Sequence, residues 1–254
     1  MNYPILDFDR ESEEIIKAKD HFKKINGFPK VIVSCFSGKI ISKWAQKKGI
    51  EIIAFLGSAN GKYPIYKTIY KGVEVGFTTA PVGAPMCVGM AEELVALGAE
   101  NLVYLGSCGA LDKNIKENEI IIPYRAIRDE GISYHYQEPS IFNYMNEDTV
   151  KKIEEVLINN NYKYTRATTW TTDAFYRETR NVLAKRKEQG ATVVDMEVAS
   201  LIAFSNFRNV KYAQFMYTAD NLDAVVWDKR NLSLQAETYS EEYMILGFEI
   251  GLNM

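Results

Sequence analysis

The sequence predicts one α/β domain, in which helices flank a central, mixed and twisted β-sheet. Short apolar runs typical of buried strands alternate along the chain with longer stretches of helical spacing. No repeat, low-complexity tract or linker divides the chain, and 254 residues with 47% hydrophobic content can form one large core. Residues 31–254 are therefore expected to form the domain, and residues 1–30 an N-terminal extension packed on it.

Each predicted strand is a short apolar run bounded by glycine, proline or polar residues. In chain order, the predicted strands are residues 31–36, 51–56, 65–70, 73–79, 101–105, 119–123, 162–171, 191–196 and 210–219. Residues 65–70 and 73–79 surround Lys71 and Gly72, which suggests a hairpin.

The predicted helices have apolar residues at helical intervals. They are residues 39–48, 86–97, 147–158, 179–189, 197–209 and 231–246. Gly49 and Gly98 follow the first two, as expected where a helix stops.

The composition argues against several classes of function. The 30 basic and 33 acidic residues give a net charge of -3, and the basic residues are scattered, which argues against a nucleic-acid surface. Residues 1–10 lack a signal pattern, and no apolar run approaches the ~20 residues of a membrane span, so we expect a cytoplasmic protein. Cys35, Cys87 and Cys108 are too few for a disulfide framework, and Cys108 is expected to be a small buried residue.

Two acidic residues stand where predicted strands end. Glu197 follows the strand at 191–196, and Asp220 follows the strand at 210–219. Small ligands bind at the carboxyl ends of strands in open α/β sheets, so this carboxylate pair suits a sugar diol and a polar heterocycle. The competing interpretations are a helix-start acid for Glu197 and turn chemistry for Asp220.

The segments at 193–200 and 217–221, together with 106–111 and 171–176, carry a family resemblance. The chain resembles the family 1 nucleoside phosphorylases, which include purine nucleoside and uridine phosphorylases and related nucleosidases. The resemblance runs from about residue 31 to the last helix, and it implies the nucleoside phosphorylase fold.

The resemblance implies a role for each residue of the two acidic segments. Glu197 would accept hydrogen bonds from the ribose 2′ and 3′ hydroxyls, with Met196 against the sugar; such charge-assisted bonds are roughly twice as strong as neutral ones. Asp220 would protonate a departing purine near N7. Uridine phosphorylases usually lack this aspartate, so a purine-like base is favoured.

Further substrate-binding residues follow from the other two segments. Phe175 and Tyr176 match the aromatic pair that lies near the base in the family, although core packing competes for any single aromatic residue. Arg180 could read a base carbonyl, which keeps uridine open as a substrate. Small residues of the predicted glycine turn would let a ligand approach the backbone, and those assigned to substrate binding are Ser107, Cys108 and Gly109.

The expected phosphate site departs from the family pattern. Tyr104 and Leu105 stand where the phosphorylases carry an arginine, and residues 35–39 replace the usual Gly-Asp-Pro loop with its arginine. The candidate phosphate ligands are instead Ser107, Gly38, Lys39 and Arg128. For Arg128 an ion pair with a neighbouring acid is equally open, and His135 is open as a 5′-hydroxyl contact, a base or a structural residue.

The resemblance therefore predicts phosphorolysis of a ribonucleoside to free base and ribose 1-phosphate. Inorganic phosphate would be the co-substrate, with no metal and no organic cofactor. The alternatives are a hydrolytic nucleosidase, a uridine phosphorylase, or a nucleoside-binding protein without turnover. Family members form dimers, trimers or hexamers, so a homo-oligomer is expected.

Overall fold

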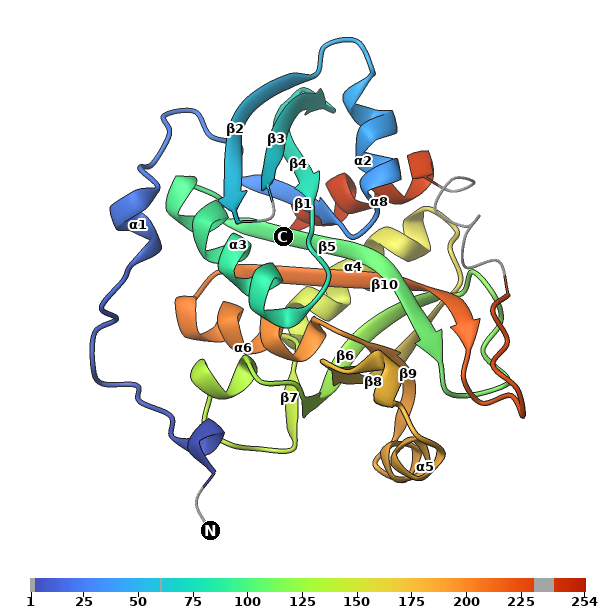
Figure 1. Cartoon of the computed structure of the whole chain (residues 1–254). Coiled ribbons are helices and arrows are strands. Elements are labelled where there is room, and N and C mark those ends of the chain that lie inside the picture. The colour runs from blue at the N-terminus through green and yellow to red at the C-terminus, as the bar shows by residue number, and fades with distance from the viewer. Residues whose placement is uncertain (1–2, 60, 231–239) are drawn as a thin grey trace.

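The protein is described from a computed structural model, which covers residues 3–59, 61–230 and 240–254. A mixed β-sheet lies at the centre with helices around it, as the sequence predicts (Figure 1). The strands are β1 (Val31–Cys35), β2 (Glu51–Ser58), β3 (Gly61–Tyr70), β4 (Val73–Thr79), β5 (Asn101–Ala110), β6 (Ile120–Asp129), β7 (Phe142–Tyr144), β8 (Tyr164–Thr172), β9 (Ala191–Asp195) and β10 (Lys211–Asn221). The α-helices are α1 (Ala18–His21), α2 (Gly38–Ala45), α3 (Ala84–Leu97), α4 (Glu147–Asn159), α5 (Arg180–Glu188), α6 (Val198–Arg208) and α8 (Ser240–Asn253).

Half of the sheet closes on itself. β5 pairs with β9, β9 with β8, β8 with β6 and β6 with β10, and β10 pairs back with β5. β1, β4, β3 and β2, in that order, extend this circuit from β5, and β7 pairs with β6. Because β5, β9 and β10 share one junction, side chains from their ends can meet around a single space.

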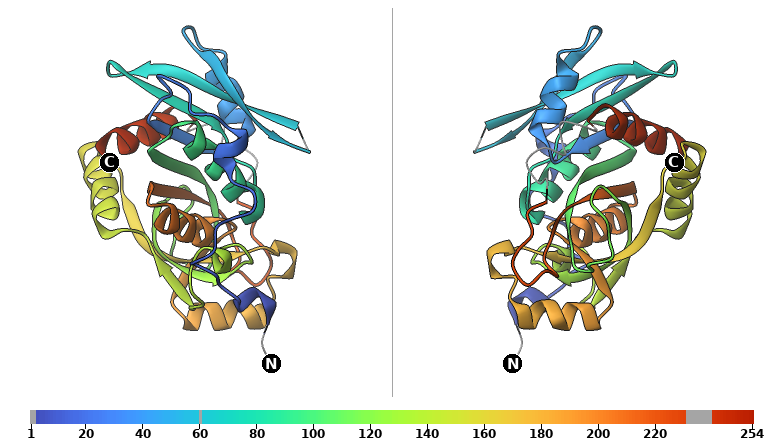
Figure 2. Two further views of the ribbon diagram at one scale, coloured as in Figure 1. Left: turned by 90° about the vertical axis from the view of Figure 1, so that its left-hand side faces the viewer. Right: turned by 90° about the vertical axis from the view of Figure 1, so that its right-hand side faces the viewer.

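The helices cover the sheet with apolar faces. α8 packs on β1 and β5 and also against α4, while α6 packs against β6 and β10. In α6, Val198 to Ser205 are all buried, so this helix is enclosed by the core rather than amphipathic. The side views place β2 and β3 at one end of the molecule and α5 at the other (Figure 2).

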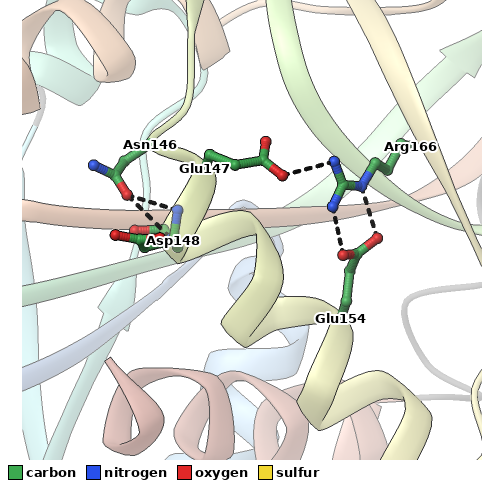
Figure 3. Close-up of polar contacts among 6 residues, drawn as sticks. Asn146, Glu147, Asp148, Glu154 and Arg166 are labelled. Carbon is green, nitrogen blue, oxygen red and sulfur yellow. Dashed lines mark hydrogen bonds and ion pairs between the residues drawn. The ribbon is translucent and has the colours of Figure 1, made fainter.

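An ion-pair cluster anchors the start of α4 to β8 (Figure 3). The Asn146 side chain caps the helix by accepting from the backbone N–H groups of Asp148 and Thr149, at 2.9 and 3.2 Å. Arg166 on β8 donates from Nε to Glu154 at 2.7 Å and from Nη1 to Glu147 at 3.1 Å. These contacts lie away from the sheet junction and hold the scaffold.

The structure corrects the sequence prediction in three places. The predicted turn at 106–109 is wrong, because β5 continues to Ala110 and its backbone pairs with β10 and β9. β7 was not predicted, because it has only three residues. The last helix ends at Asn253 rather than at residue 246, and the part of its predicted range at 231–239 lies outside the described residues.

The N-terminal segment runs along the domain surface. The short 3-10 helix Pro4–Leu6 contacts the 3-10 helix Ser133–His135. Farther along, the Phe8 and Phe207 rings meet edge to face, with their centroids 6.4 Å apart. Within the described residues, no helix is long and apolar enough to cross a membrane.

Candidate active site

A cavity of about 680 Å³ opens at the junction of β5, β9 and β10. The ends of these strands lie together beside α5 (Figure 1). Nine residues expected to bind the nucleoside line its wall: Ser107, Cys108, Gly109, Phe175, Tyr176, Arg180, Met196, Glu197 and Asp220. Four segments far apart in the sequence are thus brought to one site.

Two acidic residues at the end of β9, Asp195 and Glu197, have different roles. Asp195 accepts from the backbone N–H groups of Glu197 and Val198 through Oδ2, at 2.7 and 2.6 Å, and so caps the start of α6. Its Oδ1 accepts from the hydroxyls of Thr169 and Thr171, at 2.7 and 2.8 Å. Because Asp195 carries the helix-start role, the carboxylate of Glu197 is left to face the cavity.

Glu197 is held by the backbone of Gly83 and of Met196. Its Oε1 accepts from the N–H of Gly83 at 2.6 Å, and Gly83 has a φ of 98°, a conformation that favours glycine. Burial, with the neighbouring charge of Asp195, raises the pKa of Glu197 to about 8. The partners of this carboxyl group are backbone N–H groups, so ribose hydroxyls could occupy its remaining hydrogen-bonding capacity.

Asp220 enters the cavity from an irregularity in β10. The pairing of β10 with β5 shifts register between Thr218 and Asp220, and such a bulge re-aims the side chain that follows it. The indole N–H of Trp227 donates to Asp220 Oδ2 at 2.7 Å. Burial raises the pKa of Asp220 above its usual value, a shift in the direction of the protonated form that a proton donor needs.

Gly109 lets the strands approach at this point. A Cβ at Gly109 would lie 2.7 Å from Leu222 and 2.9 Å from Val194, and 3.1 Å from Oδ1 of Asp220. Any larger residue would displace the acid or the neighbouring strand. The glycine thus serves close packing within β5 rather than a phosphate-binding turn.

The mouth of the cavity carries the aromatic pair and Arg180. Phe175 and Tyr176 are 51% and 89% exposed, so neither ring is a core residue, and their centroids lie 4.1 Å apart. Arg180 donates to the carbonyl oxygens of Leu222 and Val225, at 3.0 and 2.8 Å. The guanidinium therefore ties α5 to the segment that follows β10.

The position expected for a phosphate-binding arginine is filled by a neutral buried network. Tyr104 is 2% exposed, and its hydroxyl is hydrogen-bonded to Ser34 and to the thiol of Cys87. Its ring lies 6.0 Å from that of Phe36, which lines the cavity. At the positions where the resemblance implies phosphate-binding arginines, this chain thus packs two aromatic rings.

Arg128 is corrected as a phosphate ligand, because the structure places it away from the cavity. The guanidinium donates to the hydroxyls of Ser133 and Ser140, both at 2.8 Å, and to the carbonyls of Glu138 and Gln137, at 2.6 and 3.1 Å. Arg128 is only 4% exposed. It holds the 133–140 loop together, and the acids expected as its ion-pair partners do not bind it.

Replacing Arg128 with alanine should therefore affect stability rather than phosphate binding. The change removes the four hydrogen bonds of a buried guanidinium and should lower the free energy of unfolding by about 2–4 kcal/mol. Chemical denaturation measures this loss, and the exposed Arg10→Ala variant serves as the control. A fully stable Arg128→Ala variant would contradict the structural role.

Three other candidates lie outside the cavity wall. Gly38 and Lys39 are exposed at the start of α2, two and three residues after the cavity-lining Phe36. Their role as phosphate ligands stays a prediction. His135 is exposed at the end of a 3-10 helix and does not line the cavity.

Sequence reasoning missed several wall residues. Glu178 lies between the aromatic pair and Arg180, and Trp227 follows β10. Gln214 lies within β10, where its Oε1 accepts from the Tyr212 hydroxyl at 2.6 Å. Gln214 could have been noticed as a polar residue within an otherwise apolar predicted strand, because buried polar residues need a hydrogen-bond partner. Glu178 was visible beside Arg180, but its sequence neighbours do not show which way the side chain points.

The cavity wall is strongly acidic. Among the described residues that line it, four are carboxylic acids, namely Glu178, Asp195, Glu197 and Asp220, and one is a cation, Arg180. Cys108 adds no thiolate, because burial raises the pKa of its thiol well above the usual value. Such a wall suits a neutral ligand with many hydrogen-bond donors better than an anion.

Sequence comparison relates the chain to a known protein family. A sequence profile described as the phosphorylase superfamily matches residues 30–242. The chain is 26% identical to a uridine phosphorylase of Thermococcus kodakarensis over 186 residues, which cover 68% of this chain and 65% of that enzyme. It is 26% identical to a DeoD-type purine nucleoside phosphorylase of Bacillus cytotoxicus over 183 residues, 71% of this chain and 77% of the relative.

A solved structure shares the fold. The AMP nucleosidase of Bacteroides thetaiotaomicron superposes with a TM-score of 0.72 at 18% identity, covering 90% of this chain and 89% of that protein. At this identity the likeness shows the fold alone, and it confirms the predicted architecture. The match to the Thermococcus enzyme spans just under two thirds of that enzyme's length.

Proposed function

Because the chain belongs to the phosphorylase superfamily, we propose that it cleaves the N-glycosidic bond of a purine-like ribonucleoside, with inorganic phosphate as the acceptor. One observation carries the proposal: Glu197, which follows β9, and Asp220, near the end of β10, face one cavity with distinct surroundings. A sugar and a leaving base need two such carboxyl groups in different roles.

The chemistry divides between the two carboxyl groups. Glu197, beside Met196, accepts from the ribose hydroxyls and fixes the sugar. The protonated carboxyl of Asp220 donates to the base as the bond breaks, so that the base departs neutral. Proton donation of this kind contributes typically 10²–10⁴-fold to the rate. The exposed aromatic rings of Phe175 and Tyr176 offer flat faces for the heterocycle.

Phosphate as the acceptor is supported by the curated relatives, which are phosphorylases. Phosphate carries a charge of about -1.5 to -2 at neutral pH, so its site must supply donors and cations. Ser107 in the cavity wall and Lys39 at the start of α2 are the ligands we propose. A homo-oligomer, in which a second copy adds further cations, also belongs to this proposal.

Hydrolysis is the second candidate, favoured by the charge of the wall. The wall offers a dianion one guanidinium among four carboxyl groups, whereas water needs no fixed cation. The guanidinium of Arg180 already donates to two carbonyl oxygens.

The two candidates are separated by varying the phosphate concentration. Purified protein is incubated with purine nucleosides at increasing phosphate, and sugars and bases are quantified by chromatography. Phosphorolysis predicts that base release rises with phosphate and that ribose 1-phosphate forms in equal amount. Free ribose, formed at a rate indifferent to phosphate, would establish hydrolysis instead.

Lys39→Ala refines this test. If Lys39 binds phosphate, its replacement should raise the phosphate KM more than the nucleoside KM, because it removes charge from the anion site alone. Equal changes in both constants would remove Lys39 from the site.

A further inference from the structure

Glu178 presents an unpartnered carboxyl group to the cavity. Within the described part of the chain, no hydrogen bond or ion pair engages this side chain, although it is partly buried in the wall. The other cavity carboxylates differ, because Asp195 has four donors, Glu197 has the Gly83 N–H and Asp220 has the Trp227 indole. The acceptor capacity of Glu178 is therefore available to a ligand.

Glu178 lies in the cavity wall beside the aromatic pair. It directly follows the 3-10 helix Phe175–Arg177, which carries the two exposed aromatic rings, and its backbone N–H donates to the Phe175 carbonyl at 3.4 Å. Glu178 and Asp220 line the same cavity, and the charge of Asp220 contributes to raising the pKa of Glu178. In a purine, the substituent at position 6 adjoins N7, so a group beside the N7 acid is placed to meet position 6.

The two possible substituents interact oppositely with a carboxylate. A 6-amino group donates hydrogen bonds, which an ionised carboxylate accepts, whereas a 6-oxo group turns lone pairs toward it. Building on the proposed function, we propose that Glu178 reads the substituent at position 6 of the base and that its ionised form selects 6-amino over 6-oxo purine nucleosides.

The charge state of Glu178 makes this selection depend on pH. Burial, and secondly the charge of Asp220, raises the pKa of Glu178 to about 7. The charged groups facing the same space are Asp220 from β10, Arg180 from α5, and Asp195 and Glu197 from the β9–α6 junction. Above about pH 7 the carboxylate accepts from a 6-amino group, and below it the protonated carboxyl can donate to a 6-oxo group.

The test compares adenosine with inosine between pH 6 and pH 8. The ratio of kcat/KM for adenosine to that for inosine should rise about tenfold across this range, as Glu178 ionises. Titration of Asp220 cancels from the ratio, because both purines need the same proton at N7. Direct binding of adenine and hypoxanthine, measured by calorimetry over the same range, should change in the same direction.

Glu178→Gln provides the decisive variant. The amide has nearly the same shape but does not titrate, so the ratio should become independent of pH, while Glu188→Gln at the exposed end of α5 should keep the parent profile. Two results would overturn the role of Glu178 at position 6 while leaving the proposed function intact. In the first, the parent cleaves both nucleosides with a kcat/KM ratio that does not change with pH. In the second, Glu178→Gln keeps the pH dependence of the parent ratio. Cleavage of neither nucleoside would overturn the proposed function, and with it this inference.

Discussion

Replacing Glu197 with alanine is expected to lower kcat/KM for ribonucleosides by on the order of 10²-fold or more, because the contacts of its carboxyl group with the ribose hydroxyls are lost. The side chain lines the cavity, and its only protein partners in the described residues are backbone groups, so a ribose would supply further partners. Steady-state kinetics on a ribonucleoside measure the loss. The exposed Glu188→Ala variant should match the parent.

Glu197→Gln separates this loss from damage to the fold. The pKa of Glu197 is raised from 4.5 to about 8, so the folded protein holds this proton more tightly than the unfolded chain. The contribution of this group to stability is therefore present below about pH 4.5 and is lost as the pH rises through about 8. Because the amide does not titrate, Glu197→Gln should melt no lower than the parent at pH 8 while losing activity. A variant as active as the parent would exclude Glu197 from sugar binding.

Replacing Asp220 with asparagine should cost roughly 10²–10⁴-fold in kcat for purine nucleosides, because the proton donor is removed. The loss should be small for nucleosides whose leaving groups need no proton. Asparagine keeps an oxygen that can accept from the Trp227 indole, so the local structure should persist. Kinetics with the two kinds of leaving group measure the difference.

Asp223→Asn is the matched control for Asp220. Asp223 forms an ion pair with Lys187 at 2.5 Å and does not line the cavity. Its replacement should leave the rates for both leaving groups unchanged. Equal losses for the two leaving groups in Asp220→Asn would assign Asp220 a structural role.

The regular part of the fold could be predicted from the sequence because the signals were local. The apolar run at 31–36 and the glycine after α3 marked a strand and a helix end that the structure contains. The glycines at 106 and 109 were misread as a turn, because close contact with Phe36 and Leu222 also demands glycine. Only the folded packing distinguishes these two uses.

Part of the site could also be predicted, because some of its signals were local in the sequence. Glu197 and Asp220 stood at recognisable strand ends, and both face the cavity. Arg128 had equally suggestive neighbours, but the loop at 133–140 turns back and takes up its donors. Glu178 was overlooked because its importance arises from its nearness to Asp220, which is distant in the sequence.

The acidity of the cavity bears directly on the reaction. Carboxyl groups suit a ribonucleoside, whose sugar and base carry donors, and they oppose the entry of phosphate. If phosphorolysis is correct, Ser107 and Lys39, or a second copy of the chain, must offset this repulsion.

Turnover itself is the measurement that tests the central claim most directly. Adenosine is incubated with the protein and phosphate, and free adenine is quantified over time beside Asp220→Asn. The account predicts many equivalents of adenine per protein chain, each matched by one pentose product, with release strongly reduced in the variant. Nucleoside binding without any release of base would contradict it and would identify a binding protein instead.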